Sequence, residues 1–330
     1  MVRLDRNERV GLWPAKVWHE IQSAITPEVL MSYPELGPLY DKIAGHLKVD
    51  RQQLLLSHGS DVALKTIFET YIGHEDEAVM VRPSYAMYPV YAQMVGAKAT
   101  EVSFLEDLSL PFDLVLKAIT DRARIVCLPN PNQPVERIFT EAELEEIMGL
   151  SLEKDFLLVI DEAYHYFYDR SAVPYIRDHP NLIVTRTFSK AFGIAGLRAG
   201  LIISNEERIS DLRKVKPISE INGVAVKVIE FFLDRMDIVK THVAEVNRGR
   251  EVVQKHAEAL GIKTHGVTGN SILLRMKNID EVSALVAAAR EKGYLIKGSL
   301  PYPAEKCIRI TLGYERYMEE IMSIMERSLR

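Results

Sequence analysis

The fold of this chain is constrained most by an alternation of short apolar runs with segments of helical periodicity. The runs consist of consecutive aliphatic and β-branched residues, which is typical of strands that are buried on both faces. They cover residues 78–81, 124–128, 156–160, 182–187 and 201–204. Helical spacing lies between them at 61–72, 85–95, 141–150 and 206–215. This alternation predicts an α/β domain with a mostly parallel central sheet covered by helices.

The pattern changes after residue 216, where two long helices are predicted at 220–234 and 238–260. Strands and helices then alternate again over a shorter stretch. The predicted strands are 271–276, 294–297 and 307–312, and the predicted helices are 279–292 and 316–330. The change predicts a second, smaller α+β domain at the C-terminal end.

These patterns divide the chain into three predicted regions. Residues 1–30 contain an amphipathic segment at 15–25 and are predicted to form an N-terminal arm. Residues 31–235 are predicted to form the large α/β domain, and residues 236–330 the small domain. We found no internal repeat and no low-complexity linker, which excludes solenoid architectures.

Composition excludes several classes of function. The 41 basic and 46 acidic side chains give a formal net charge of -5, so no general attraction to nucleic acid or anionic membranes is expected. No apolar run approaches the ~20 residues of a membrane span. Charged residues stand near the N-terminus where a secretory signal would be apolar, and we expect a cytoplasmic protein. Two cysteines, Cys127 and Cys307, are too few for a disulfide framework or a zinc ribbon, and no metal site is predicted.

A lysine follows the buried run at 182–187 after only a short turn. Lys190 should therefore lie at the edge of the sheet, where ligands bind in open α/β folds. The hydroxyls of Thr187 and Ser189 and the guanidinium of Arg198 lie nearby in sequence and could form an anion cradle. The alternative is a solvated lysine before an ordinary glycine-containing connection.

An acid ends the neighbouring apolar run. Asp161 follows residues 156–160 and is predicted to lie at the same sheet edge, where burial is costly unless the acid faces a cation. Tyr164, three residues on, could offer its phenol to the same site. Taken alone, such an aspartate is more often a loop residue or a helix cap.

Two further segments could bind a ligand. Ser60 and Asp61 open a predicted helix, whose unpaired N–H groups and dipole attract anions, although simple capping is an equal alternative. Tyr85 and Tyr88 follow the run at 78–81 and could stack on a planar ligand or fill the core.

Taken in order, these segments resemble the class I/II aminotransferases, which are pyridoxal-phosphate enzymes of fold type I. The resemblance is greatest to the histidinol-phosphate aminotransferase family and covers almost the whole chain. The matching segments are 32–34, 59–61, 83–88, 130–134, 161–164, 187–190 with Arg198, and 307–313.

The resemblance implies a pyridoxal 5'-phosphate enzyme of amino-acid biosynthesis that moves an amino group between an amino acid, or an amino alcohol phosphate such as histidinol phosphate, and a 2-oxo acid such as 2-oxoglutarate. Lys190 would form the Schiff base with the cofactor and act as the proton-transfer base. Asp161 would pair with the ring nitrogen, Tyr164 would bond the ring hydroxylate, and Tyr85 would stack on the ring.

The same resemblance implies roles at the two ends of the ligands. The cofactor phosphate would bind Ser60 and Asp61 at the helix start, with Thr187, Ser189 and Arg198 around it. Arg309 would hold the substrate carboxylate in a forked pair. Tyr33 would reach the phosphate of the neighbouring subunit, so a homodimer is expected.

The chain departs from the family pattern at four places. Gln133 stands where an asparagine normally reaches the ring hydroxyl, and Val135-Glu136 replaces a Thr-Gly turn. Lys297 stands where members that bind phosphorylated substrates carry an arginine, and Asn7 lies in a segment that matches only in part. These departures concern mainly the substrate contacts, so the amino donor need not be histidinol phosphate.

Two alternatives stay open at this stage. One is a decarboxylase that resembles the threonine-phosphate decarboxylases, which share these motifs. The other is a binding protein that keeps the fold without the cofactor, although Lys190 and Asp161 together argue against it.

Overall fold

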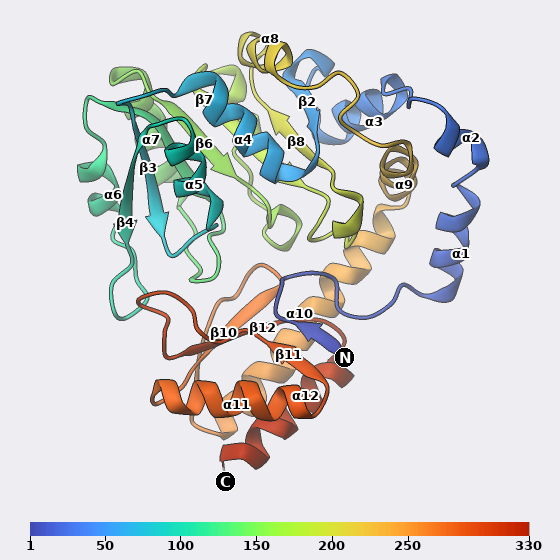
Figure 1. The fold of residues 1–330 in the computed structure, drawn as a ribbon, viewed down its shortest axis with the longest axis vertical. Coiled ribbons are helices and arrows are strands. Elements are labelled where there is room, and N and C mark those ends of the chain that lie inside the picture. The colour runs from blue at the N-terminus through green and yellow to red at the C-terminus, as the bar shows by residue number, and fades with distance from the viewer. Residues whose placement is uncertain (330) are drawn as a thin grey trace.

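The computed structural model describes residues 1–329, and its upper part is built on one seven-stranded sheet (Figure 1). The strand order is β2-β8-β7-β6-β5-β3-β4. The strands are β2 (Leu54–Ser57), β3 (Glu77–Arg82), β4 (Lys98–Ser103), β5 (Ala123–Pro129), β6 (Leu157–Asp161), β7 (Leu182–Thr187) and β8 (Gly200–Ile203). Strands β4, β3, β5, β6 and β7 run parallel, which confirms the mostly parallel sheet.

Strand β8 is the exception, because it pairs antiparallel with both β7 and β2. A parallel return needs a crossover, usually a helix, whereas the segment between β7 and β8 holds only the single 3-10 turn η4 (Ala195–Leu197). The chain therefore folds back antiparallel and leaves Lys190 on the connecting segment.

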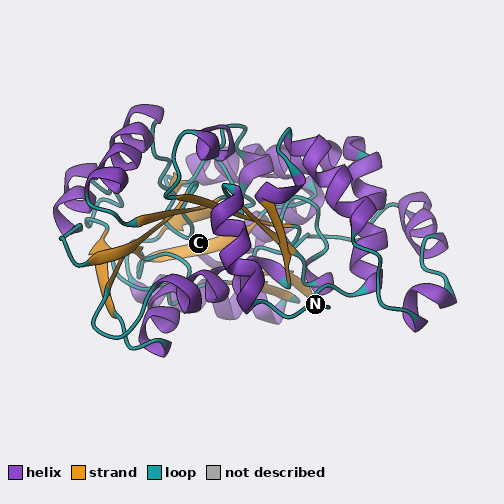
Figure 2. Cartoon of the chain, turned by 90° about the horizontal axis from the view of Figure 1, so that it is seen from above, coloured by secondary structure: helices purple, strands orange, loops and turns teal. Residues whose placement is uncertain are grey.

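Helices cover both faces of this sheet, and Figure 2 shows helices on both sides of the strands. Consecutive strand residues alternate between the faces, so Val126 and Leu128 pack into one core while Ile125 and Cys127 pack into the other. The first core also receives α3 (Gly37–Leu47), α6 (Phe112–Ala118), α7 (Glu141–Glu153) and α9 (Gly223–Asp234). The second receives α4 (Gly59–Tyr71), α5 (Met87–Met94) and α8 (Glu206–Val215).

The lower part of the molecule has a separate core around two small sheets. One sheet has the order β12-β10-β9, and in the other β1 pairs parallel with β11. The strands are β1 (Val2–Leu4), β9 (Lys263–His265), β10 (Ser271–Arg275), β11 (Tyr294–Ile296) and β12 (Cys307–Thr311). The helices are α10 (Met236–Ala259), α11 (Ile279–Glu291) and α12 (Glu315–Leu329); the predicted helix end at Arg330 lies outside the described residues.

The first thirty residues contact both parts of the molecule. Strand β1 belongs to the lower sheet, whereas Ile21 of α1 (Ala15–Ser23) packs into a core of the upper part, and α2 (Pro27–Met31) follows. The remaining 3-10 turns are η1 (Arg51–Gln53), η2 (His165–Phe167) and η3 (Val173–Arg177). The domain limits at residues 30 and 235 stay a prediction.

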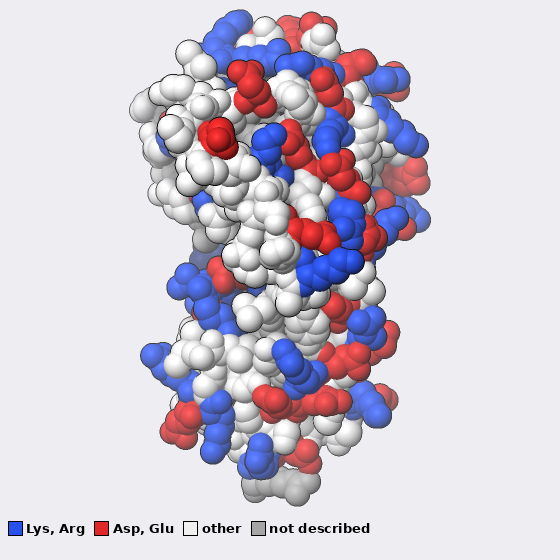
Figure 3. Space-filling model, turned by 90° about the vertical axis from the view of Figure 1, so that its right-hand side faces the viewer, with Lys and Arg blue, Asp and Glu red and all other residues white. Residues whose placement is uncertain are grey.

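The surface shows no segregation of charge on the face drawn in Figure 3, where basic and acidic side chains are interspersed and the outline narrows between the upper and lower parts. Among the helices of residues 1–329, none combines the length and the apolar character that crossing a membrane requires.

Candidate active site

A cavity of about 430 Å³ lies at the carboxyl ends of the parallel strands. Its walls come from the ends of β5 and β6, the turn after β7, the start of α4, the N-terminal segment and β12. The sequence-predicted residues that line it are Asn7, Ser60, Asp61, Tyr85, Gln133, Asp161, Tyr164, Thr187, Ser189, Lys190, Arg198 and Arg309. Parallel strands end at one edge of the sheet, which is why residues so far apart in sequence meet there.

Asp161 is buried at this edge, with only 5% of its surface exposed. Its carboxylate accepts hydrogen bonds from the Tyr88 hydroxyl at 2.7 Å, the Thr185 hydroxyl at 3.1 Å and the Ala163 N–H at 3.1 Å. These donors are all neutral. Burial raises the pKa of Asp161, and the hydrogen bonds from Tyr88 and Thr185 oppose that rise. The acid is therefore placed to receive a positive charge from a ligand.

Lys190 lies on the segment after β7 and lines the same cavity. Its Nζ donates to the backbone carbonyl of Asn7 at 3.1 Å and lies 5.9 Å from the centre of the Tyr164 ring. Within residues 1–329 no carboxylate pairs with this lysine, so it can exchange its backbone partner for a ligand.

The start of α4 forms an anion-binding corner. The N-cap residue His58 makes no side-chain capping bond, and its own N–H donates to the Glu220 carboxylate at 2.6 Å. Ser60 and Asp61 of the first turn line the cavity, where helix N–H groups can bind an anion. Gly59 has φ +82°, and a Cβ there would lie 2.9 Å from Arg198 Nη2, so the guanidinium sits directly against the helix start. Arg198 Nη1 donates to the Ser189 hydroxyl at 3.4 Å, and the Thr187 hydroxyl accepts from the Ser189 N–H at 3.1 Å.

The side chain of Asp61 is held by two phenols. Tyr85 donates to its Oδ1 at 2.8 Å, and Tyr91 donates to the same oxygen. Burial and the bond to Asp61 raise the pKa of Tyr85, so this phenol stays protonated. Tyr85 remains 40% exposed, and its ring borders the cavity.

Gln133 bridges the upper and lower parts of the molecule. Its Oε1 accepts from the Ser271 hydroxyl at 2.9 Å, and its Nε2 is buried with no hydrogen-bond partner in the described residues. A Cβ at Gly269 would lie 3.0 Å from that nitrogen and 3.4 Å from the Tyr164 ring. Gln133 thus keeps an unused donor next to Tyr164.

Asn7 fixes the N-terminal segment inside the site. Its φ of 53° is left-handed, and its N–H donates to the Thr311 hydroxyl at 3.0 Å. Its side-chain nitrogen donates to the Tyr164 hydroxyl at 2.9 Å, and its carbonyl accepts from Asn270 at 2.9 Å as well as from Lys190. Asn7 therefore touches two of the predicted catalytic side chains.

Arg309 lines the cavity from β12 and is bound to the same segment. Its Nη2 donates to the backbone carbonyl of Asp5 at 2.6 Å. Burial lowers the pKa of Arg309, and the hydroxyl of Tyr164 and the carboxylate of Asp5 oppose that effect. A buried guanidinium with a backbone partner has capacity left for an incoming carboxylate.

Two predicted residues do not line this cavity. Lys297 is paired with Arg309 through reciprocal backbone hydrogen bonds of 3.0 and 2.7 Å, but its side chain is exposed and borders a neighbouring cavity beside Asp5. Tyr33 is 84% exposed and lies outside the cavity of its own chain.

Sequence reasoning missed several contacts. Tyr88 was weighed only as a stacking or core residue, yet it donates directly to Asp161. Its spacing of three residues from Tyr85 on a helical segment was the available signal. Thr185, Asn270 and Thr311 had none, because each acts through a partner that is distant in sequence.

The chain matches the family Aminotransferase class I and II over residues 19–324. It is 31% identical to a histidinol-phosphate aminotransferase of Thermoanaerobacter pseudethanolicus, over 94% of this chain and 88% of that protein. It is 33% identical to a histidinol-phosphate aminotransferase of Christiangramia forsetii, over 85% of this chain and 80% of that protein.

Solved structures share the fold at lower identity. The histidinol-phosphate aminotransferase of Sinorhizobium meliloti in complex with pyridoxal-5'-phosphate superposes with a TM-score of 0.88 at 22% identity, covering 100% of this chain and 91% of that one. The L-threonine-O-3-phosphate decarboxylase of Porphyromonas gingivalis gives a TM-score of 0.83 at 20% identity, covering 100% and 99%.

Proposed function

Since this chain belongs to the class I and II aminotransferases, we propose that its amino donor is an amino acid or an amino alcohol phosphate such as histidinol phosphate, with a 2-oxo acid such as 2-oxoglutarate as acceptor. The chain is a pyridoxal-phosphate-dependent aminotransferase, and the names of its relatives fit a role in amino-acid biosynthesis. The fold and the cofactor agree with the expectations from the sequence.

The cavity fits pyridoxal phosphate on three observations. Asp161 is buried among neutral donors, and none of the described residues gives it the positive partner that a protonated ring nitrogen would provide. The uncapped start of α4 and Arg198 offer an anion-binding corner for the phosphate. Gln133 Nε2 is an unused donor beside Tyr164, where the ring hydroxyl would need one.

The buried Asp161, together with Lys190 in one cavity, is the observation that carries the proposed assignment of roles. Bound pyridoxal phosphate supplies an aromatic electron sink for negative charge at the substrate α-carbon. Asp161 would hold the proton on the ring nitrogen, because a carboxylate there stabilises the cationic ring. Lys190 Nζ would move the proton between the substrate α-carbon and C4' of the cofactor.

The remaining cavity residues orient the two ligands in this proposal. Tyr164 and Gln133 donate to the ring hydroxyl, and Tyr85 packs on the ring face. The phosphate is held by the backbone of Ser60 and Asp61 at the helix start. The side chains that complete this cradle are Thr187, Ser189 and Arg198.

The substrate end is proposed to use Arg309 for a carboxylate or a comparable anion, with Asn7 beside it. Arg309 exchanges the Asp5 carbonyl for the substrate. Lys297 lies opposite Arg309 in the small sheet, so the two side chains share a face. From its position in the neighbouring cavity, Lys297 would attract the distal phosphate of a phosphorylated substrate. As a point charge it recognises phosphate less selectively than an arginine would.

We also propose a homodimer in which Tyr33 of one subunit completes the phosphate site of the other. The support is that Tyr33 is 84% exposed and lies away from the cavity of its own chain. Sedimentation of the wild type and of Tyr33→Phe, with cofactor affinity measured in parallel, tests this arrangement. A monomer with full cofactor affinity would contradict it. A cytoplasmic location likewise stays a prediction.

A donor screen tests the substrate proposal. The holoenzyme is incubated with 2-oxoglutarate and either histidinol phosphate, aromatic amino acids or short phosphorylated amino acids, and glutamate is measured. Glutamate formation with one class identifies the donor. Release of carbon dioxide without glutamate would instead support a decarboxylase, whose likeness to this chain is one of fold alone.

A further inference from the structure

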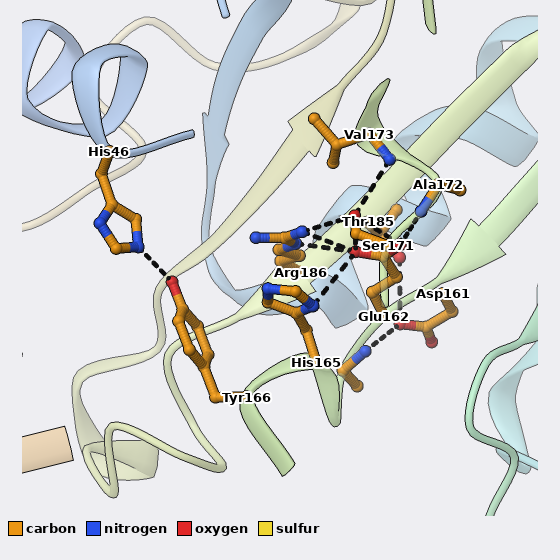
Figure 4. Close-up of polar contacts among 11 residues, drawn as sticks. His46, Asp161, Glu162, His165, Tyr166, Ser171, Ala172, Val173, Thr185 and Arg186 are labelled. Atoms are coloured by element: carbon orange, nitrogen blue, oxygen red, sulfur yellow. Dashed lines mark hydrogen bonds and ion pairs between the residues drawn. The ribbon is translucent and has the colours of Figure 1, made fainter. Parts of the chain in front are cut away.

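A second cavity of about 430 Å³ lies behind the strands that carry the active site. Asp161, at the end of β6, lines the first cavity and accepts a hydrogen bond from the Thr185 hydroxyl of β7. The next residues, Glu162 and Arg186, point the other way, because successive side chains alternate between the faces of a sheet. Figure 4 shows this second group, with Arg186 between Ser171 and the pair formed by His46 and Tyr166.

The floor of the second cavity is a buried charged network. Arg186 is only 5% exposed; its Nε donates to Glu162 at 2.9 Å and its Nη2 to the Ser171 hydroxyl at 2.7 Å. Glu162 also accepts from the Ala172 N–H at 2.5 Å. These bonds fix the guanidinium at the cavity wall and balance its charge with that of Glu162 (Figure 4).

The rim adds two cations whose charge is not balanced. Lys48, at the end of α3, and Arg177, at the end of η3, both border the cavity and are exposed. In the part of the chain that the structure describes, neither cation forms an ion pair. The cavity therefore carries an excess of about two positive charges, although the whole chain is acidic.

The two histidines of this cavity do not add charge near neutral pH. Burial and, to a lesser extent, the neighbouring Arg186 lower the pKa of His165 to about 3. Burial and Arg186 also lower the pKa of His46, whose Nε2 lies 2.8 Å from the Tyr166 hydroxyl. Both rings are thus neutral polar groups, and apolar walls at Val173 and Ile176 complete the cavity.

We propose that this second cavity binds a small phosphate-bearing or dicarboxylate anion between Lys48, Arg177 and Arg186. Its ionised group bonds the two rim cations, and its carbon skeleton lies against Val173 and Ile176. The site is separate from the substrate cavity, since the two share no lining residue.

Inorganic phosphate is the probe, titrated calorimetrically into the cofactor-loaded enzyme. The double variant Lys48→Glu with Arg177→Glu should weaken phosphate binding at this site by about tenfold or more, because attraction at both rim positions becomes repulsion. Both residues are exposed, so the variant should fold, and unchanged aminotransferase activity verifies that it does. Lys255→Glu, an exposed lysine on α10 with no ion pair in residues 1–329, changes a charge far from the cavity and should leave binding within about twofold.

The substrate cavity is the other place where phosphate could bind. Arg309→Ala separates the two sources, because it removes a cation that lines the substrate cavity and leaves Lys48 and Arg177 in place. Binding that survives in Arg309→Ala and weakens in the double variant supports the second site. Binding lost in Arg309→Ala, binding unaffected by the double variant, or no binding by the wild type would each overturn the proposal.

Discussion

Two adjacent carboxyl groups at the end of β6 lie on opposite faces of the sheet and differ in the charge of their hydrogen-bond partners. Asp161 and Glu162 are both buried, with 5% and 2% of their surfaces exposed. Glu162 is neutralised by Arg186 and closed off by further donors, whereas Asp161 has only neutral donors around it. A buried acid that is paired with a cation of the same chain has a structural role, whereas a buried acid without such a cation is a candidate for binding a ligand.

The largest expected effect comes from removing the amine of Lys190, which lines the same cavity as Asp161. Lys190→Ala should lower turnover by about 10⁴-fold or more, because it removes the group proposed to move the proton. The cofactor should still bind through the phosphate corner and Asp161, which absorbance of the purified variant measures. Substantial retained turnover would contradict the role given to Lys190.

Replacing the uncompensated acid should damage activity more than stability. Asp161→Asn is expected to lower kcat by about 10³-fold, equivalent to about 4 kcal/mol, because the ring nitrogen would lose the carboxylate proposed to pair with it. The thermal midpoint of the cofactor-free variant should not fall, since the amide has no charge to bury. A variant that loses stability and keeps its kcat would reverse the proposed roles of the two acids.

The adjacent acid provides the matched control, and its substitution should have the opposite outcome. Glu162→Gln leaves Arg186 buried without its partner, which should cost about 3 kcal/mol of unfolding free energy. The folded fraction should keep kcat within about tenfold, because Glu162 faces away from the active site. Denaturant unfolding and activity per folded molecule separate these outcomes, and a loss of kcat with full stability would contradict the comparison.

The smallest expected effect is a difference in how stability depends on pH between the cofactor-free and the cofactor-loaded wild type. Burial raises the pKa of Asp161 above its ordinary value of 3.8, so the cofactor-free native state binds this proton more tightly than the unfolded chain does. This contribution to stability is present at low pH and is lost as pH rises through the raised pKa. In the proposed arrangement the bound cofactor places a cation at the Asp161 carboxylate, so cofactor binding should abolish the contribution. Identical pH profiles for the cofactor-free enzyme and its Asp161→Asn variant would refute it.

The sequence predicted the residues at the sheet edge more fully than the contacts of the N-terminal segment. Asp161 and Lys190 could be placed because each follows an apolar run that identifies a buried strand. The contacts of Asn7 could not, because they join it to Lys190 and to Thr311, residues 183 and 304 positions away. No local pattern records such distant pairing.

The strands that the sequence missed have a similar explanation. Strand β4 is an edge strand with mixed burial, and its polar residues mask the apolar run that identifies a buried strand. Strand β2 is fully buried but only four residues long, which is too short for a distinct pattern. The antiparallel pairing of β8 is explained by the short connection between β7 and β8, and the residues of the strand itself do not indicate its direction.

The pairing of β1 with β11 also sets the order in which the enzyme can mature on the ribosome. Asn7 and Asp5 each precede their partners, Thr311 and Arg309, by 304 positions. The nascent chain must therefore hold Asp5 and Asn7 without these partners while the intervening residues are synthesised. A product that ends before Arg309 would carry the motifs of the sheet edge without these contacts.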